Sequence, residues 1–161
     1  MATHDELDAI EQIKKLKARY FRGLDSQDWE LYGSVFAEDV VVDTTLGGGE
    51  VVRGREPMVA AVRGLQMVQS VHHGHMPEIE LTSATTATGI WTLEDYNIWP
   101  DGSQHHGWGH YLETYEKQDG RWYIKTLKLS YLRVESTLGK APKVAGVEGT
   151  GHLRGANPAK G

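Results

Sequence analysis

The sequence contains no cysteine, and this absence removes several kinds of chemistry at once. Without thiols the chain can form no disulfide, no thiolate nucleophile and no cysteine-ligated zinc site. It also lacks a hydrophobic run as long as a membrane span, and its acidic, polar N-terminus does not resemble a signal peptide. We therefore expect a cytoplasmic protein with no membrane partner.

A basic surface is missing as well. The 161 residues include 17 Lys and Arg against 22 Asp and Glu, a formal net charge of −5. Because nucleic-acid-binding domains usually carry a basic stripe, this balance argues against a nucleic-acid partner. Neither a phosphate-binding loop nor a zinc signature is present. We expect a small-molecule substrate and acid–base side chains as the source of any chemistry, with no metal and no cofactor. A metal site with histidines as its only ligands stays a minor alternative.

What the chain does have is a change from helical to alternating periodicity. Apolar residues recur at helical spacing from Ile10 to Leu24 after a possible N-cap at Asp5, and shorter helices are predicted at 29–36 and 57–65. Alternating patterns and turns predict strands at 40–43, 51–52, 70–82, 86–98, 106–118 and 121–135. Helices followed by long antiparallel strands indicate an α+β fold with helices on one face of a curved sheet.

The composition changes near the C-terminus. We place one domain at residues 1–137, a length that can bury a real core. The segment 138–161 is rich in glycine and poor in large apolar side chains, which is typical of an irregular tail. Within it, we expect 138–153 to form an ordered arm on the domain or on an adjacent subunit, and 155–161 to be disordered.

Several apolar stripes end in a polar group, as expected for a pocket at the open end of a core. By strand alternation Asp95 shares a face with Trp91, and Arg133 shares a face with Tyr131. A carboxyl group in such apolar surroundings has a raised pKa unless a partner offsets the cost of burial. Arg133 is either that partner or a clamp for substrate.

The order of four segments resembles the SnoaL-like branch of the nuclear-transport-factor-2-like superfamily, over about residues 5–135. The segments are ARYFRGLDSQDW, VHHGHMPEIEL, GIWTLEDY and GHYLETYEKQDGRWYIKTLKLSYLRVE. Within the superfamily the chain is similar to scytalone dehydratase, bile-acid 7-alpha-dehydratase and hexachlorocyclohexane dehydrochlorinase. The resemblance implies a cone-shaped antiparallel barrel with three helices over its concave face, a cofactor-free lyase activity and, often, a trimer.

The same resemblance implies roles for individual residues. It places Asp25 and His72 at the positions of a catalytic His–Asp dyad. It places Tyr20, Asp95 and Arg133 at a tyrosine, a second aspartate and an arginine of the bile-acid enzyme. The doublet of His72 and the following histidine leaves this register open by one residue.

Each candidate also has a structural explanation. His72 could be a core histidine, Asp25 could cap the helix that follows it, and Tyr20 could simply pack in the core. The histidines at 105 and 106 follow a turn, so we expect them to be solvated. Further substrate contacts are expected from Trp91, Met76, His110 and Tyr131.

Three functions remain open from the sequence. The first is a dehydratase-type lyase that removes water or a similar group from a cyclic or aromatic apolar substrate, with His72 and Asp25 as the base. The second is a ketosteroid-isomerase-like or polyketide-cyclase-like enzyme, with Asp95 as acid or base and Tyr20 donating to an oxyanion. The third is a non-catalytic ligand-binding or assembly module. A histidine paired with an aspartate favours the first.

The outer face of the sheet is predicted to be unusually aromatic. We expect Tyr111, Tyr115 and Tyr123 to lie there beside His73 and His75, which is more aromatic surface than a solvated face needs. The sequence therefore predicts a homo-oligomer, a trimer or dimer, that buries part of this face.

Overall fold

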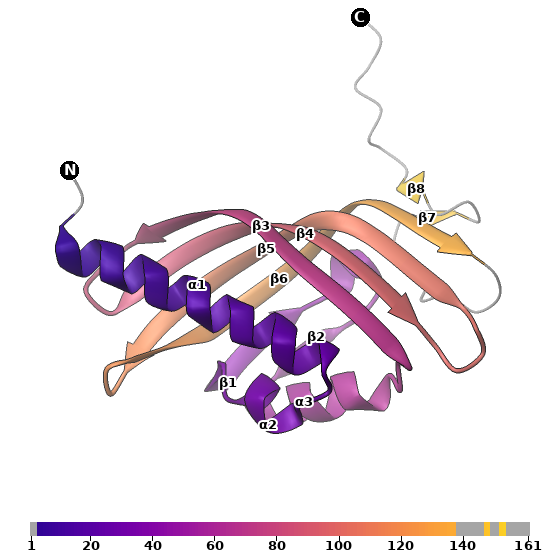
Figure 1. The fold of residues 1–161 in the computed structure, drawn as a ribbon, viewed down its shortest axis with the longest axis horizontal. Helices are drawn as coiled ribbons and strands as arrows, with labels where there is room; N and C mark the ends of the chain where they lie inside the picture. Colours follow the sequence, from indigo (N-terminus) through magenta and orange to yellow (C-terminus); the bar gives the residue numbers. More distant parts are fainter. Residues whose placement is uncertain (1–2, 138–146, 149–151, 154–161) are drawn as a thin grey trace, which may run out of the picture.

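The N-terminal helix lies across the concave face of a strongly curved sheet, as Figure 1 shows. This computed structural model describes residues 3–137, 147–148 and 152–153. Its helices are α1 (His4–Asp25), α2 (Trp29–Gly33) and α3 (Arg55–Gly64). Among the described helices there is none with the length and apolar character needed to cross a membrane.

A capping box begins α1. The hydroxyl of Thr3 accepts a hydrogen bond from the backbone of Glu6 at 3.2 Å, and the Glu6 carboxylate accepts one from the backbone of Thr3 at 2.6 Å. The prediction of Asp5 as the N-cap was therefore wrong by two residues. The apolar face of α1 is buried as its spacing predicted, at Ile13, Leu16, Tyr20 and Leu24.

Six strands form the main sheet, in the order β2-β1-β6-β5-β4-β3. They are β1 (Phe36–Asp43), β2 (Val51–Arg53), β3 (Gln69–Leu81), β4 (Thr86–Ile98), β5 (Gln104–Gln118) and β6 (Arg121–Thr137). The α+β class is confirmed, but the sheet is mixed because β1 runs parallel to β6. The turns in the sequence reveal which neighbouring strands form hairpins. They carry no information about a pairing between strands so far apart in the chain.

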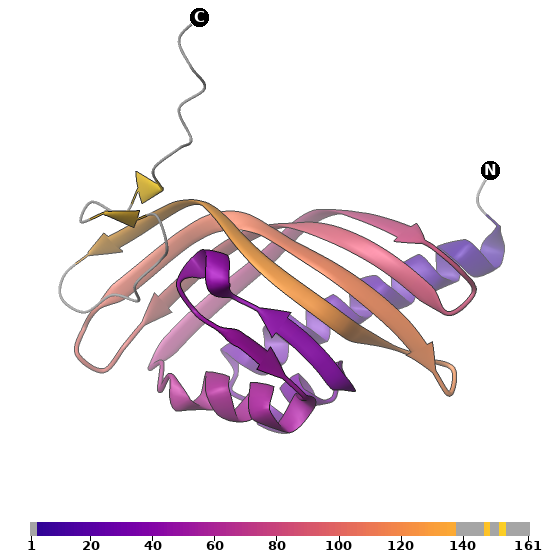
Figure 2. The same cartoon turned by 180° about the vertical axis from the view of Figure 1, so that it is seen from behind.

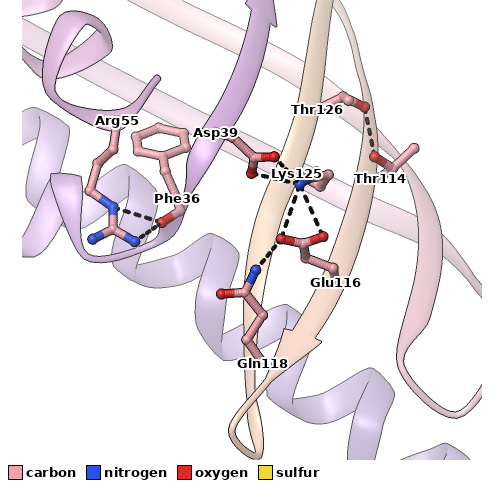
Figure 3. Close-up of polar contacts among 8 residues, drawn as sticks. All are labelled: Phe36, Asp39, Arg55, Thr114, Glu116, Gln118, Lys125 and Thr126. Carbon is pink, nitrogen blue, oxygen red and sulfur yellow. Dashed lines mark hydrogen bonds and ion pairs between the residues drawn. The ribbon is translucent and has the colours of Figure 1, made fainter. Parts of the chain in front are cut away.

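The β1–β2 pair stands in front of the long strands when the molecule is seen from behind (Figure 2). Polar contacts fix this part of the fold (Figure 3). The guanidinium of Arg55, in the first turn of α3, donates to the carbonyl of Phe36 at 2.9 and 2.6 Å. The ammonium of Lys125 on β6 lies 2.5 Å from a carboxylate oxygen of Asp39 and 3.2 Å from one of Glu116. Through these contacts α3 and β1 are held beside the long strands.

The concave face of the sheet carries two of the three tyrosines that were expected outside. Cross-strand neighbours share a face, and Tyr111 pairs with Trp91 while Tyr115 pairs with Ala87. All four side chains are buried in the core beneath α1. The prediction that Tyr111 and Tyr115 lie on the outer face was therefore wrong, and the argument for an oligomer loses two of its aromatic residues. The oligomeric state itself stays a prediction.

Beyond β6, two short segments form an antiparallel pair, β7 (Val147–Glu148) and β8 (His152–Leu153). The remainder of the predicted arm at 138–153, and the predicted disordered end at 155–161, lie outside the described residues. The domain boundary after residue 137 likewise stays a prediction.

Candidate active site

His72 on β3 is in direct contact with Asp25 at the end of α1. The ring nitrogen Nδ1 of His72 lies 2.7 Å from Asp25 Oδ1. The backbone N–H of His72 donates to Asp25 Oδ2 at 2.8 Å, and the hydroxyl of Ser70 donates to Oδ1 at 3.0 Å. Three contacts therefore hold the carboxylate in one orientation. The predicted pairing is confirmed in its geometry, whereas its catalytic role stays a prediction.

Local capping explains why Asp25 is available for this contact. The residue that caps α2 is Asp28, whose carboxylate accepts a hydrogen bond from the backbone of Leu31 at 3.0 Å. Asp25, the last residue of α1, is free of that role and points to β3 instead. The alternative in which Asp25 is a helix cap is thus wrong.

His72 borders a cavity of about 440 Å³ between the helices and the concave face of the sheet. Most of the wall is apolar, with residues from α3, β1, β6 and the loop between β1 and β2. Asp25 does not line this cavity. Because Nδ1 of His72 is turned to Asp25, Nε2 is the ring nitrogen left for a molecule inside the cavity. The side chain of His72 is only 8% exposed, so such a molecule would exclude most solvent from it.

A second polar cluster lies across the strand from the dyad. Asp95 on β4 is the direct cross-strand partner of His72. Its Oδ2 accepts a hydrogen bond from the hydroxyl of Tyr131 at 2.5 Å, and its Oδ1 lies 3.3 Å from Nε2 of His105. All four residues line the cavity. His72 and this cluster therefore face one cavity, as the sequence predicted for His72, Asp95 and Tyr131.

The protonation states in this cluster follow from its contacts. Burial alone would raise the pKa of Asp95, but the contact with His105, the proximity of His72 and the bond from Tyr131 outweigh it. The pKa of Asp95 is consequently held below its ordinary value. Burial, and then the charge of Asp95, raises the pKa of Tyr131 well above its usual range. At neutral pH the pair is a carboxylate and a neutral phenol.

Tyr20 lines the cavity from α1 and is itself almost fully buried. Burial raises the pKa of Tyr20 well above its ordinary value, so its hydroxyl is a proton-bearing phenol. Its ring lies edge-on to that of Tyr111, with centroids 5.9 Å apart. Tyr20 therefore both packs in the core and presents a polar group to the cavity, which combines the two explanations that the sequence left open.

Behind these tyrosines lies a buried ion pair. The ammonium of Lys17 is 2.5 Å from Glu113 Oε1, and both side chains are 0% exposed. The same ammonium lies 3.9 Å from the ring centroid of Tyr20 and 3.6 Å from that of Tyr111. Tyr115 donates a hydrogen bond to the other Glu113 oxygen. Burial lowers the pKa of Lys17, and the charge of Glu113 opposes this effect.

Comparison with known proteins identifies the family. The SnoaL-like domain family matches residues 5–128. The chain belongs to this family. Its fold is the nuclear-transport-factor-2-like fold, as the order of the sequence segments had suggested.

Several solved structures resemble this SnoaL-like protein over most of their length. A putative scytalone dehydratase from Novosphingobium aromaticivorans is 21% identical, with a TM-score of 0.77 over 91% of this chain and 99% of that one. A hexachlorocyclohexane dehydrochlorinase of type 3 from Novosphingobium barchaimii is 19% identical, with a TM-score of 0.75 over 84% and 94%. A Mycobacterium tuberculosis protein of unknown function is 27% identical, with a TM-score of 0.70 over 86% and 78%. The distant relatives of this fold thus include dehydratases and dehydrochlorinases.

Two predicted substrate contacts of this SnoaL-like protein lie outside the cavity because β-bulges change which way side chains point. Met76 lies within a register shift in β3 and is 87% exposed, with a positive φ of 42°. In β6 the pairing skips Leu132, so Tyr131 points inward and Arg133 points out. Arg133 lies over the ring of Trp108, 5.4 Å from its centroid, and is not the partner of Asp95.

Two other predicted substrate contacts, Trp91 and His110, do not reach the cavity. Trp91 does point to the concave side, but it lies in the core, where its indole N–H donates to the hydroxyl of Tyr115 at 2.8 Å. His110 alternates with the buried Gly109 and Tyr111 and so lies on the outer face. Neither side chain borders the cavity.

The sequence reading missed His105 and Asn97, which both line the cavity. His105 was expected to be solvated, but it is only 3% exposed because it lies in alternating register with Gly107, Gly109 and Tyr111. That alternation was visible in the sequence. The turn before His105 is typical of a solvated position, and it therefore favoured the wrong prediction.

Unsatisfied polar atoms gather around the cavity. Six buried side-chain atoms in the described part of the chain have no hydrogen-bond partner, and five of them belong to residues that line the cavity. These five are the Tyr32 hydroxyl, one carboxylate oxygen of Asp95, the amide oxygen of Asn97 and both ring nitrogens of His105. The Asp95 oxygen and Nε2 of His105 lie 3.3 Å from each other without forming a well-aligned hydrogen bond. Because buried polar groups are nearly always paired in folded proteins, all five atoms are suited to contact a bound polar molecule.

Proposed function

We propose that this protein is a cofactor-independent lyase. It removes a proton and a neighbouring leaving group, in the simplest case water, from a small cyclic or aromatic substrate. The observation that carries the proposal is the His72–Asp25 dyad, which presents one free imidazole nitrogen to a mostly apolar cavity. The names of the distantly related dehydratase and dehydrochlorinase support the same reaction class.

The first step is proton abstraction by His72. Nε2 takes a proton from a carbon next to a carbonyl group, a task for which imidazole has a suitable basicity near neutral pH. Asp25 keeps the other nitrogen protonated and stabilises the imidazolium that forms. The electron pair of the broken C–H bond passes into an enolate, whose oxygen accepts a hydrogen bond from the phenol of Tyr20.

The second step is departure of the leaving group. The enolate electrons form the carbon–carbon double bond while the bond from carbon to the leaving hydroxyl breaks. The imidazolium of His72 returns its proton to that hydroxyl, so water leaves and the dyad is restored. Asp95, whose pKa is held low by His105, His72 and Tyr131, orients the hydroxyl by accepting a hydrogen bond from it at Oδ1. The proton balance of the cycle closes within the site.

The substrate is expected to be largely apolar with polar groups at two positions. The wall of the cavity is mainly apolar, which suits a ring of carbon atoms. The unpaired atoms of Asn97 and His105 suit a second hydroxyl or carbonyl, away from the atoms that react. The isomerase alternative with Asp95 as base has less support, because the contacts with His105 and Tyr131 lower the pKa of Asp95 and so make it a weaker base.

The proposal is tested by elimination assays with cyclic and aromatic β-hydroxy ketones of a size that fits the cavity. Formation of the conjugated enone is followed by ultraviolet absorbance, with the wild type beside His72→Ala and a control variant, His110→Ala. We expect turnover that the control retains and His72→Ala lacks. Isomerised product without elimination would favour the isomerase alternative. Binding with no conversion of any kind would favour a non-catalytic module.

A further inference from the structure

We infer that His73, His75 and Glu94 form a binding site for a transition-metal dication such as Zn²⁺ on the outer face of the sheet. This face is turned away from the helices and from the cavity. The site is separate from the proposed catalytic residues.

Strand register brings the three side chains together. His73 and His75 are two residues apart on β3, so they point to the same side. Glu94 on β4 is the direct cross-strand partner of His73. One possible ligand atom from each of the three side chains lies within 4.8 Å of the other two. Within the described residues this is the one group of three or more such side chains that meets this spacing.

The separation suits a metal ion after small side-chain rotations. Ligand atoms about 2.0–2.1 Å from a tetrahedral zinc lie roughly 3.4 Å from one another. His73 and His75 are exposed and Glu94 is half-buried, so their rotamers can close the remaining gap without moving the backbone. Two imidazoles and one carboxylate favour Zn²⁺, Cu²⁺ or Ni²⁺ over Mg²⁺ and Ca²⁺, which prefer oxygen ligands. Three protein ligands leave a fourth position for water.

The Glu94 side chain is already held in position for metal binding by a neighbouring histidine. Nε2 of His106 lies 2.8 Å from Glu94 Oε1, and the His106 ring stacks on Trp108 with centroids 3.9 Å apart. The contact with His106 fixes the orientation of the Glu94 carboxylate and leaves Oε2 without a share in that bond. Outer contacts of this kind usually support metal ligands.

The site is tested with the full chain and Zn²⁺ alone, in buffer freed of metal by a chelator. Zinc affinity and stoichiometry are measured by competition with a chromophoric chelator, for the wild type and for His73→Ala, His75→Ala and Glu94→Gln. We expect one zinc per chain and an affinity at least about tenfold weaker in each variant. Zinc should also raise the melting temperature of the wild type and leave that of His73→Ala unchanged.

Two control variants distinguish this site from other histidines. His110→Ala removes a histidine on the same face, two strands from His75 through Thr92, and His72→Ala removes the cavity histidine. Both should bind zinc as the wild type does. The inference is overturned if either control loses affinity as strongly as His73→Ala. A ratio of one zinc per two chains, or equal affinity in all variants, would also overturn it.

Discussion

The His72–Asp25 and Lys17–Glu113 pairs both join α1 to the sheet, yet only one of them has an atom facing open space. His72 keeps Nε2 toward the cavity while Asp25 holds the opposite nitrogen. Lys17 is enclosed completely, by Glu113 on one side and by aromatic rings on the others. By the proposed mechanism, access to the cavity, and not pairing alone, is what distinguishes His72 from Lys17.

Two tyrosines lie between these pairs and connect their roles. Tyr20 and Tyr111 line the cavity on one side and contact the ammonium of Lys17 on the other. The Lys17–Glu113 pair therefore supports the wall of the proposed active site without contacting a bound substrate. Lys17 is by this account a positioning residue, and its loss should act first on stability.

The largest effect, a loss of stability, is expected from breaking the Lys17–Glu113 pair. Lys17→Met leaves the Glu113 carboxylate buried without a cation, and such a change typically costs about 3–5 kcal/mol of unfolding free energy. Urea denaturation of the wild type and the variant measures this loss. The double variant Lys17→Met/Glu113→Gln should recover part of it because no charge is left unpaired. A loss below about 1 kcal/mol in the single variant would mean that the pair is not structural.

Breaking the His72–Asp25 pair should instead affect turnover. Asp25→Asn keeps the size of the side chain but removes the charge that stabilises the imidazolium of His72. We expect kcat to fall by about 10²–10⁴-fold, with the unfolding free energy changed much less than by Lys17→Met. Steady-state kinetics beside a urea titration provide both numbers. Full activity in Asp25→Asn would contradict the dyad.

A smaller effect on stability and turnover is expected at Gly107, whose backbone packs against the cluster of Asp95, His105 and Tyr131. Gly107 is the cross-strand partner of Asp95. A Cβ atom there would lie 2.5 Å from Asp95 Oδ1 and 2.9 Å from His105 Nε2, and closer still to the ring of Tyr131. Gly107→Ala should therefore displace this cluster at a cost of about 1–3 kcal/mol, and it should lower kcat as well. Unchanged stability and kcat in Gly107→Ala would show that the cluster tolerates displacement. Gly64→Ala, at the end of α3, is a control for substitution alone, because a Cβ atom there would meet open space and the backbone has no positive φ.

The smallest effect concerns acid stability. Because the folded-state pKa of Asp95 is lowered, its ionised form stabilises the fold at pH values above the ordinary aspartate pKa of about 3.9. That contribution is lost as the pH falls through the folded-state value. Thermal unfolding of Asp95→Asn between pH 6 and 2 should therefore show a shallower decline in melting temperature than the wild type. Parallel curves would contradict the lowered pKa.

The parts of this protein that the sequence revealed are those set by local pattern or by uninterrupted alternation. The apolar spacing of α1 correctly placed Tyr20 on its buried face, and the register of β3 placed His72 inward. A family resemblance supplied the pairing of His72 with Asp25, since the two lie 47 positions apart and no local rule joins them.

The failures have physical causes at particular residues. Bulges in β3 and β6 turned Met76 and Arg133 outward, and a bulge leaves no clear mark in a sequence. Lys17 and Glu113 could have been found, because Lys17 follows Ile13 at helical spacing and Glu113 alternates with buried tyrosines. Their charge suggested a solvated surface, and only their mutual contact makes burial possible.

The most direct test of the central claim isolates the base from the leaving group. A cyclic ketone that fits the cavity but has no leaving group is incubated with the protein in D₂O, and deuterium uptake at the carbon next to the carbonyl is followed by NMR. The account predicts exchange catalysed by the wild type and by His110→Ala, and exchange slowed by about 10²–10⁴-fold in His72→Ala. Equal exchange in the wild type and His72→Ala would contradict the claim that His72 is the base.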